Sequence, residues 1–237
     1  MKPGNSNTFI SMIRKHSLYF FLFALFIVAG GIYTAMSGKT DALFYFNENR
    51  QPFWDVFFRF ATKLGEGYVY IIAALVALFY RLRYFLLIAA GGLMVMLVSV
   101  VTKSYFAVDR PLAMLRKEGL ENLLNPVADV TLHTGATSFP SGHAMSALCF
   151  YTLILLILPP RRWLDALFFL LAMVVVISRV YLFQHFWQDV YAGAITGFAL
   201  AVLLYALQQK LTGPRFSWLD HPVFNRKTGW VGNGSRE

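Results

Sequence analysis

The sequence predicts an all-α protein that crosses a membrane several times. Hydrophobic residues make up 57% of the 237 residues and charged residues only 14%, a far more apolar composition than that of an average soluble domain. The apolar residues fall in long runs, and a helix needs about 20 such residues to cross the hydrocarbon layer of a bilayer. We therefore expect a polytopic protein in which six transmembrane helices form one bundle.

Six apolar runs follow one another along the chain. They predict helices near residues 18–36, 56–80, 84–104, 142–158, 163–183 and 188–208. The first run lacks a clear cleavage site and further runs follow it, so we expect a retained helix rather than a cleaved signal peptide. The second run is the least regular, because Arg59, Lys63 and Glu66 interrupt its first half, and charged residues are costly inside a bilayer.

Basic residues are concentrated on one of the two sides that six helices create. Twelve of the 21 lysines and arginines lie in the amino end, the two short hinges and the tail, where only three acidic residues accompany them. Because cytoplasmic loops are enriched in lysine and arginine, both termini are predicted to be cytoplasmic. We expect a membrane domain over residues 1–210 and a cytoplasmic tail over residues 211–237.

The formal net charge of +9 is explained by the basic residues on the predicted cytoplasmic side. Basic residues at the cytoplasmic face orient the chain and favour anionic lipid headgroups, so no nucleic-acid partner is expected. The single cysteine, Cys149, excludes an internal disulfide and lies in an apolar run, where a buried thiol is the ordinary role. The sequence does not indicate an oligomeric state.

The first polar motif contains Lys103, Arg110 and Pro111. The two cations are seven residues apart, so they lie on one face if the helix continues, and Pro111 is expected to end that helix. Two cations facing one pocket would suit a phosphate group. The alternative is a pair of side chains that reach toward the membrane surface from a helix end.

The second motif is Pro140-Ser141-Gly142-His143, directly before an apolar run. It predicts a helix that begins here, with the N–H groups of Gly142 and His143 at its positive end, where anions bind. The Ser141 hydroxyl could donate a further hydrogen bond, and His143 could supply a proton. The alternative is an ordinary capped helix with a histidine at the membrane surface.

The third motif contains Arg179, His185 and Asp189. Four residues separate the histidine from the carboxylate, which could orient the imidazole and leave its other nitrogen aimed at phosphorus. Arg179 would lie on a different face of a continuous helix, so we expect a break near residues 183–186. The alternative is a buried histidine and aspartate that hold two helices together.

Together the three motifs resemble the signature of the type 2 phosphatidic acid phosphatase superfamily in every element. The matching residues are Lys103, Arg110, Pro111, Pro140, Ser141, Gly142, His143, Ser178, Arg179, His185 and Asp189. The resemblance implies that His185 attacks phosphorus, that Asp189 orients it, and that His143 protonates the leaving oxygen and then activates water. It also implies a set of residues that bind the phosphoryl oxygens, namely Lys103, Arg110, Ser141, Gly142 and Arg179. No metal and no cofactor are expected.

The predicted topology places all three motifs at the outward ends of helices. A phosphate site at that boundary suits a substrate whose tail stays in the bilayer, so the resemblance implies a lipid phosphate or diphosphate phosphatase in the bacterial cytoplasmic (inner) membrane, with its active site facing the periplasm. Undecaprenyl diphosphate is the favoured substrate and phosphatidylglycerophosphate an overlapping one. A lipid A phosphatase, a lipid phosphotransferase and, outside enzymes, a lipid transporter are the alternatives. The series Gly193, Gly197 and Ala201 is expected to serve close helix packing.

Overall fold

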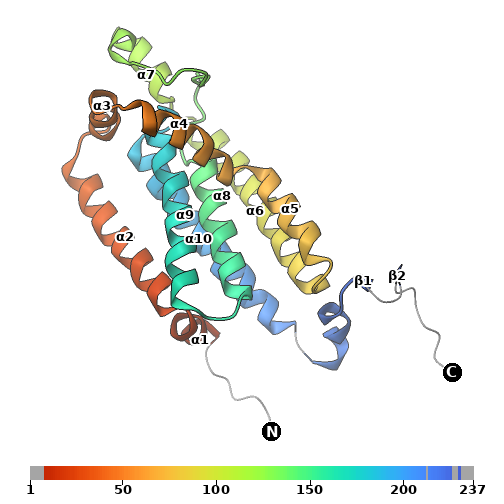
Figure 1. Ribbon diagram of the computed structural model, residues 1–237. Coiled ribbons are helices and arrows are strands. Elements are labelled where there is room, and N and C mark those ends of the chain that lie inside the picture. Colours follow the sequence, from red (N-terminus) through yellow and green to blue (C-terminus); the bar gives the residue numbers. More distant parts are fainter. Residues whose placement is uncertain (1–7, 212, 226–228, 231–237) are drawn as a thin grey trace, which may run out of the picture.

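Long helices that run side by side form the body of the computed structural model (Figure 1). The structure describes residues 8–211, 213–225 and 229–230. The five longest helices are α2 (Ser17–Met36), α6 (Leu82–Phe106), α8 (Gly142–Ile157), α9 (Arg162–Tyr181) and α10 (Trp187–Lys210). A further, bent helical segment of the bundle consists of three consecutive helices, α4 (Pro52–Ala61), the short 3-10 helix η1 (Thr62–Gly65) and α5 (Gly67–Ala77).

Several of these helices are suited to cross a membrane. By length and composition the suitable segments are α2, α9, α10 and the segment Leu82–Lys117, which begins with α6. The segments Pro52–Gly65 and Gly67–Ala77 pass the same test together, although they are bent by 52° at the break between them. Helix α8 is apolar but has only 16 residues. Four or five helices therefore meet the length criterion, and each predicted run coincides with one helix or with the bent pair.

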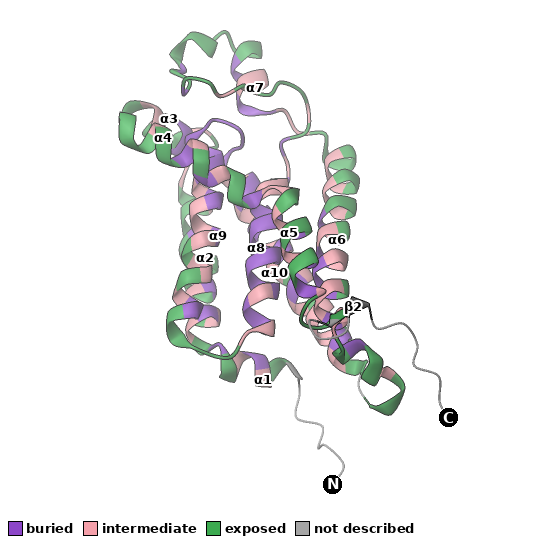
Figure 2. Cartoon of the chain, turned by 45° about the vertical axis from the view of Figure 1, so that its right-hand side comes forward, coloured by how far each residue is buried: buried purple, intermediate pink, exposed green. Residues whose placement is uncertain are grey.

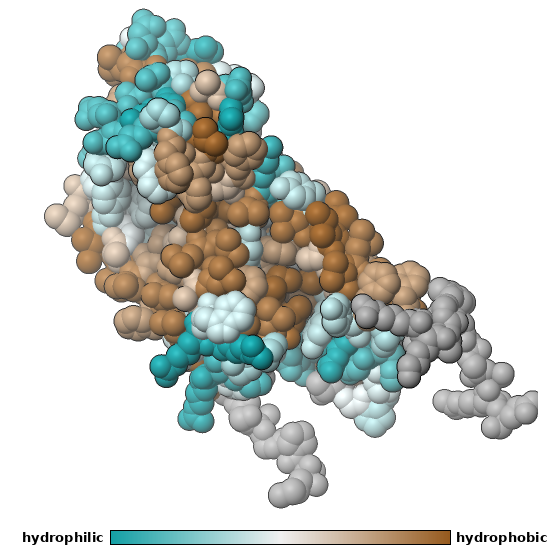
Figure 3. All heavy atoms as spheres, in the orientation of Figure 1, coloured by the Kyte–Doolittle hydropathy of each residue, from teal (hydrophilic) through white to brown (hydrophobic). Residues whose placement is uncertain are grey.

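The outer surface of the bundle is apolar between two polar ends (Figure 3). Large hydrophobic side chains on different helices are exposed there, among them Leu25, Ile71, Leu93, Leu170 and Leu203. Exposed apolar side chains on so many helices are rare on a soluble monomer, whereas in a membrane lipid chains would cover them. The surface thus agrees with the composition.

Helix α8 is the centre of the bundle (Figure 2). Twelve of its 16 residues are buried, and it packs closely against α10. A Cβ atom on Gly193 would overlap the carbonyl oxygen of Ser141, and one on Gly197 would overlap that of Met145. Only glycine lets the two backbones approach so closely, which confirms the predicted packing role of these two glycines.

Short elements and loops cover the two ends of the bundle. At one end lie α3 (Asp41–Glu48), α7 (Pro111–Lys117) and the 3-10 helix η2 (Glu121–Leu123). At the other end lie α1 (Thr8–Lys15), the 3-10 helix η3 (Pro214–Asp220) and a two-residue antiparallel pair of strands, β1 (Phe224–Asn225) and β2 (Gly229–Trp230).

The described part of the predicted tail is attached to the bundle. The Arg83 guanidinium donates two hydrogen bonds of 2.9 Å to the Asp220 carboxylate and a third, of 2.8 Å, to the Leu211 carbonyl. Arg83 is buried, and a forked, charge-assisted contact of this kind is strong. The tail therefore begins as an extension packed on α6, while residues 226–228 and 231–237 lie outside the described residues.

Candidate active site

The two cations of the first motif reach the site from separate elements. Helix α6 ends at Phe106, where Ala107 adopts a left-handed backbone with φ of 44°, and Pro111 is the first residue of α7. The expectation that Pro111 ends the helix is therefore wrong. A proline fits the first position of a helix because its missing N–H would have no partner there, and the turn before it brings Arg110 back toward the bundle.

Arg110 is buried and held at the connection between α9 and α10. Its Nη1 donates to the Gln184 carbonyl at 3.2 Å, and its Nε donates to the Thr137 hydroxyl at 3.1 Å. The Lys103 Nζ lies 3.5 Å from the place that a Cβ of Gly142 would occupy. The lysine therefore points at the amino end of α8, so the chain brings both predicted cations to the same region.

Helix α8 begins at Gly142, as the second motif predicts. The Ser141 hydroxyl caps it by accepting a hydrogen bond of 3.4 Å from the Ala144 N–H. The Ser141 N–H donates to the Asp189 carbonyl at 2.9 Å, which ties the second motif to the third. The Lys103 ammonium lies beside this helix end, and a helix amino end next to a cation is an arrangement that binds anions.

The predicted break before His185 is present. Helix α9 ends at Tyr181 and α10 starts at Trp187, and Phe183 between them has a left-handed φ of 56°. The N–H of His185 donates to the Arg179 carbonyl at 3.2 Å. The turn thus brings the histidine back beside the end of α9, close to Arg179.

His185 and Asp189 are both buried and face each other across 3.6 Å, measured from Nδ1 to Oδ2. That distance is longer than a good direct hydrogen bond. The Ser138 hydroxyl donates to the same oxygen at 2.5 Å and lies 3.5 Å from Nδ1, and the Phe186 N–H donates to it at 2.9 Å. The carboxylate therefore stands on the Nδ1 side of the ring, which leaves Nε2 as the nitrogen for a ligand.

Ser138 is a site residue that lies outside the three predicted motifs. It is separated from Asp189 by 51 residues, so no helical spacing connects them. Thr62 is a second such residue, because its hydroxyl accepts a hydrogen bond of 2.6 Å from Arg179 Nη1. The available signal was weak in both cases, a small polar residue next to a turn or inside an irregular apolar run.

Arg179 enters the site from α9 and is buried. Its Nη1 is bound by Thr62, but its Nε has no hydrogen-bond partner among the described residues. Leaving a buried donor without a partner costs free energy. An anionic ligand would remove that cost, and a guanidinium is the side chain best shaped to bind phosphate oxygens.

Burial sets the protonation state of His185, which lies in the turn between α9 and α10. It lowers the pKa of this histidine to about 4; the Asp189 carboxylate opposes the shift and the positive charge of Arg179 adds to it. At neutral pH the imidazole is therefore uncharged and retains the lone pair that a nucleophile requires.

A cavity of about 1,110 Å³ opens beside these groups. Its polar end is lined by Gly142, His143 and Arg179 of the predicted set, and its long walls are formed by apolar side chains of α5 and α6 such as Leu75 and Leu93. One end of the cavity thus suits an anion and the rest suits a lipid chain. Five other predicted residues, Lys103, Arg110, Ser141, His185 and Asp189, stand around the polar end without lining the cavity.

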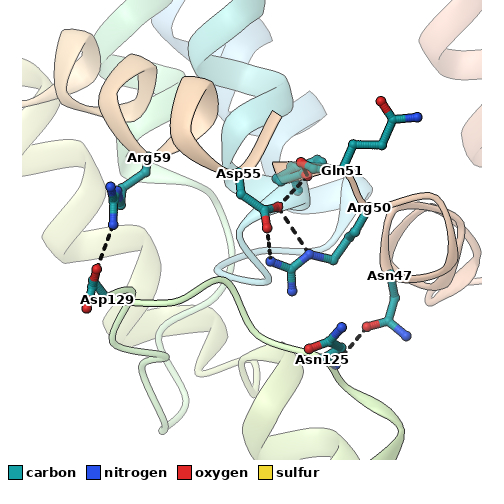
Figure 4. A network of polar contacts seen from close by, with 8 residues as sticks. Asn47, Arg50, Gln51, Asp55, Arg59, Asn125 and Asp129 are labelled. Atoms are coloured by element: carbon teal, nitrogen blue, oxygen red, sulfur yellow. Dashed lines mark hydrogen bonds and ion pairs between the residues drawn. The ribbon is translucent and has the colours of Figure 1, made fainter. Parts of the chain in front are cut away.

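Ion pairs and hydrogen bonds hold the segments around α4 together (Figure 4). The Asp55 carboxylate accepts hydrogen bonds from Arg50 at 3.2 and 2.8 Å and from the Tyr181 hydroxyl at 2.6 Å, which joins α4 to α9. Arg59 donates to Asp129 at 2.8 Å, and both of these residues line the cavity. The loop after α7 is therefore anchored to α4 at the mouth.

Within residues 8–211 and 213–225, no three histidine, cysteine, aspartate or glutamate side chains gather as a metal site would require. The groups that surround the polar end are instead three cations and a helix amino end. Metal independence remains a prediction of the sequence.

The sequence was compared with those of known protein families. A sequence profile of the PAP2 superfamily matches residues 81–213, which is more than half of the chain and includes all three motifs. The chain belongs to the PAP2 superfamily. This is the type 2 phosphatidic acid phosphatase superfamily that the motifs resemble, and it is a family of membrane lipid phosphatases.

Relatives of this PAP2 protein act on several lipid phosphates. It is 30% identical to phosphatidylglycerophosphatase B of Bacillus subtilis, over 68% of this chain and 79% of that one. It is 31% identical to lipid A 4'-phosphatase of Bacteroides thetaiotaomicron, over 80% and 84%. It is 27% identical to undecaprenyl-diphosphatase of Sulfolobus acidocaldarius, over 85% and 95%. These relatives belong to one family, but their names give three different lipid substrates.

The fold is also found among solved structures. The crystal structure of a PAP2-type phosphatidylglycerolphosphate phosphatase from Bacillus subtilis matches this PAP2 chain with a TM-score of 0.52 and 26% identity, over 85% of this chain and 99% of that one. With its apolar helices, this chain is accordingly a multi-pass membrane protein and a phosphatase of the PAP2 superfamily.

Proposed function

We propose that this PAP2 protein removes a phosphate from a lipid phosphate or diphosphate at the outer face of a bacterial cytoplasmic membrane, through a phosphohistidine intermediate. The observation that carries the proposal is the two-part cavity, whose polar end meets His143 and Arg179 and whose walls are apolar. A lipid with a phosphorylated headgroup has the same two parts.

The proposed chemistry proceeds in two steps. In the first step Nε2 of His185 attacks phosphorus, the bond from phosphorus to the leaving oxygen breaks, and His143 protonates that oxygen. In the second step His143 takes a proton from water, which attacks the phosphohistidine, so that inorganic phosphate leaves and His185 is regenerated. Asp189, held by Ser138, would stabilise the positive charge on the imidazole in both steps.

Cations and the α8 amino end would stabilise the transferring phosphoryl group. In the proposal Lys103, Arg110 and Arg179 balance its negative charge, and Ser141 and Gly142 complete the oxygen-binding set through their hydroxyl and N–H groups. The orphaned Nε of Arg179 supports this assignment. Three cations supply the charge that a metal ion provides in other phosphoryl transfer enzymes, so the proposed reaction needs neither a metal nor a cofactor.

The proposal includes a topology. It counts α8 and the bent pair as spans, which gives six, and it places both termini and the tail after residue 210 in the cytoplasm. The charge bias supports this orientation. The element positions are compatible with it, because α1 and η3 lie at the end of the bundle opposite α7 (Figure 1).

Phosphate release from three lipids tests the function. The substrates are undecaprenyl diphosphate, which the sequence favours, phosphatidylglycerophosphate and lipid A, each offered to the purified protein in detergent. We expect phosphate release from at least one of them, and its loss, by at least about a thousandfold, in His185→Ala. Transfer of labelled phosphate to a second lipid with little free phosphate would instead indicate a phosphotransferase. Full phosphate release by the His185→Ala variant would refute the mechanism.

A further inference from the structure

The break in the bent span is seated directly against the proposed catalytic centre. The bend of 52° falls between Gly65 and Gly67. A Cβ atom on Gly65 would lie 3.2 Å from the His143 carbonyl oxygen and 2.6 Å from a methyl carbon of Val175. Irregular backbone at membrane depth is tolerated where it is buried in protein or lines a cavity. The residue at the middle of this break is Glu66.

Glu66 faces the cavity without a partner. It is partly exposed and lines the cavity wall, and among the described residues its carboxylate has no hydrogen bond or ion pair. It precedes α5 but makes no capping bond to that helix. Its charge acts on Arg179, so it stands near the polar end. An ionisable side chain kept within a membrane-spanning segment is costly and marks a functional position.

The position of Glu66 along the cavity can be read from its neighbours in the sequence. Thr62, Glu66, Tyr70 and Ala74 are four residues apart and all line the cavity. Thr62 binds Arg179, whereas Ala74 belongs to the apolar wall. Glu66 is therefore the first residue after the phosphate end on the way to the lipid end. A lipid whose phosphate occupied the polar end would place the group next to that phosphate beside Glu66.

We propose that Glu66 determines which headgroup the site accepts, in that it binds a hydroxyl next to the scissile phosphate and disfavours a second phosphate there. The inference rests on the proposed function. A carboxylate only accepts hydrogen bonds, so it pairs with a hydroxyl and repels another anion. The substrate class is thus a lipid phosphomonoester in which a polyol separates the scissile phosphate from any further phosphate, as in phosphatidylglycerophosphate. In this proposal Glu66 ranks it above undecaprenyl diphosphate, whose two phosphates are directly joined, which reverses the order that the sequence favours.

Arg179, on which the charge of Glu66 acts, is assigned to the scissile phosphate by the proposed function, and the other neighbouring cations do not cancel this preference. Arg59 lines the same cavity but is paired with Asp129 at 2.8 Å. Lys63 is exposed, and its Nζ lies 5.2 Å from the centre of the Phe60 ring rather than in an ion pair with Glu66. Two negative charges brought close together in a partly buried site repel strongly enough to change a rate by at least about tenfold.

The test compares Glu66→Gln with a control that loses the same charge elsewhere. Glutamine keeps the size of the side chain and removes the charge. The control is Glu121→Gln, because Glu121 pairs with Arg116 on the exposed loop after α7 and does not line the cavity. For each protein, kcat/KM is measured for phosphatidylglycerophosphate and for undecaprenyl diphosphate. We expect Glu66→Gln to lower the first value about tenfold and to raise the second about tenfold, while the control changes their ratio less than twofold.

A second readout uses small anions and any one lipid that the protein hydrolyses. Inorganic phosphate and inorganic diphosphate are compared as competitive inhibitors. Glu66→Gln is expected to strengthen inhibition by diphosphate about tenfold relative to phosphate. Glu66→Ala should change the ratio of diphosphate to phosphate inhibition in the same way. This second variant keeps the test valid if the glutamine variant folds poorly.

The results distinguish failure of the Glu66 assignment from failure of the proposed function. If the wild type hydrolyses a lipid phosphate but Glu66→Gln changes both lipids and both inhibitors by the same factor, the assignment of Glu66 is wrong and the proposed function stands. If the wild type hydrolyses none of the lipids, both are wrong.

Discussion

At the residue scale, burial of an uncharged imidazole couples the proposed nucleophile to the stability of the fold. His185 is almost inaccessible to solvent, and its pKa is lowered to about 4, whereas an unfolded histidine titrates near 6.5. Below that pH the unfolded chain binds a proton that the folded chain does not bind. Stability is therefore complete above about pH 6.5 and is lost as the pH falls toward 4.

This coupling predicts a difference between the wild type and His185→Gln. On going from pH 7 to pH 5, the wild type should lose about 2 kcal/mol through this one group, and the glutamine variant should lose less by that amount. Thermal unfolding in detergent at the two pH values measures it. An equal loss in both proteins would show that His185 is not buried in its neutral form.

Some features of the site were predictable residue by residue, and others were not. The amino end of α8 at Gly142 and the turn that separates Arg179 from His185 follow from local spacing and from known helix start signals. Ser138 and Thr62 do not, because their partners Asp189 and Arg179 are distant in the sequence and only the tertiary fold joins them. The expected role of Pro111 as the end of α6 was wrong because a left-handed alanine at position 107, an uncommon helix stop, already ends the helix after Phe106.

At the scale of elements, the contact between α8 and α10 positions both proposed catalytic histidines. His143 belongs to the first turn of α8 and His185 precedes α10, and these two helices touch through the backbone at Gly193 and Gly197. A change in the separation of the helices would change the separation of the histidines.

Gly197→Ala tests this dependence. The added methyl group would overlap the buried Met145 carbonyl, so the helices must move apart, at a cost of about 1–3 kcal/mol. We expect a lower unfolding temperature together with reduced phosphate release. Gly67→Ala is the matched control for stability, since a Cβ at Gly67 meets nothing within 4 Å. Equal unfolding temperatures for the two variants would contradict the proposed close packing.

The element positions were largely predictable because long apolar runs dictate helices. An irregularity in the second run was predictable, because Arg59, Lys63 and Glu66 interrupt its apolar residues. The position and angle of the bend were not predictable. The break lies where Gly65 packs against His143 and Val175, and such a contact between separate helices has no signature in a single sequence.

At the scale of the whole molecule, residues spread over nearly ninety positions meet at one end of the bundle. Lys103, Arg110, Ser141, Arg179 and Asp189 come from different helices and turns, yet each lies within or beside the same polar region. The same fold leaves an apolar cavity between α5 and α6 that leads from that region. Catalytic groups and a lipid-compatible wall thus arise from one arrangement of helices, which supports the proposed covalent step at His185 with a lipid substrate.

The most direct test is to trap that step. The purified protein is mixed with a lipid substrate that carries a labelled terminal phosphate, quenched within one turnover under alkaline conditions that preserve phosphohistidine, and digested for mass spectrometry. We expect one labelled phosphate on His185 in the wild type and none in His185→Ala. Label on a different residue, or turnover of the lipid with His185 never labelled, would contradict it.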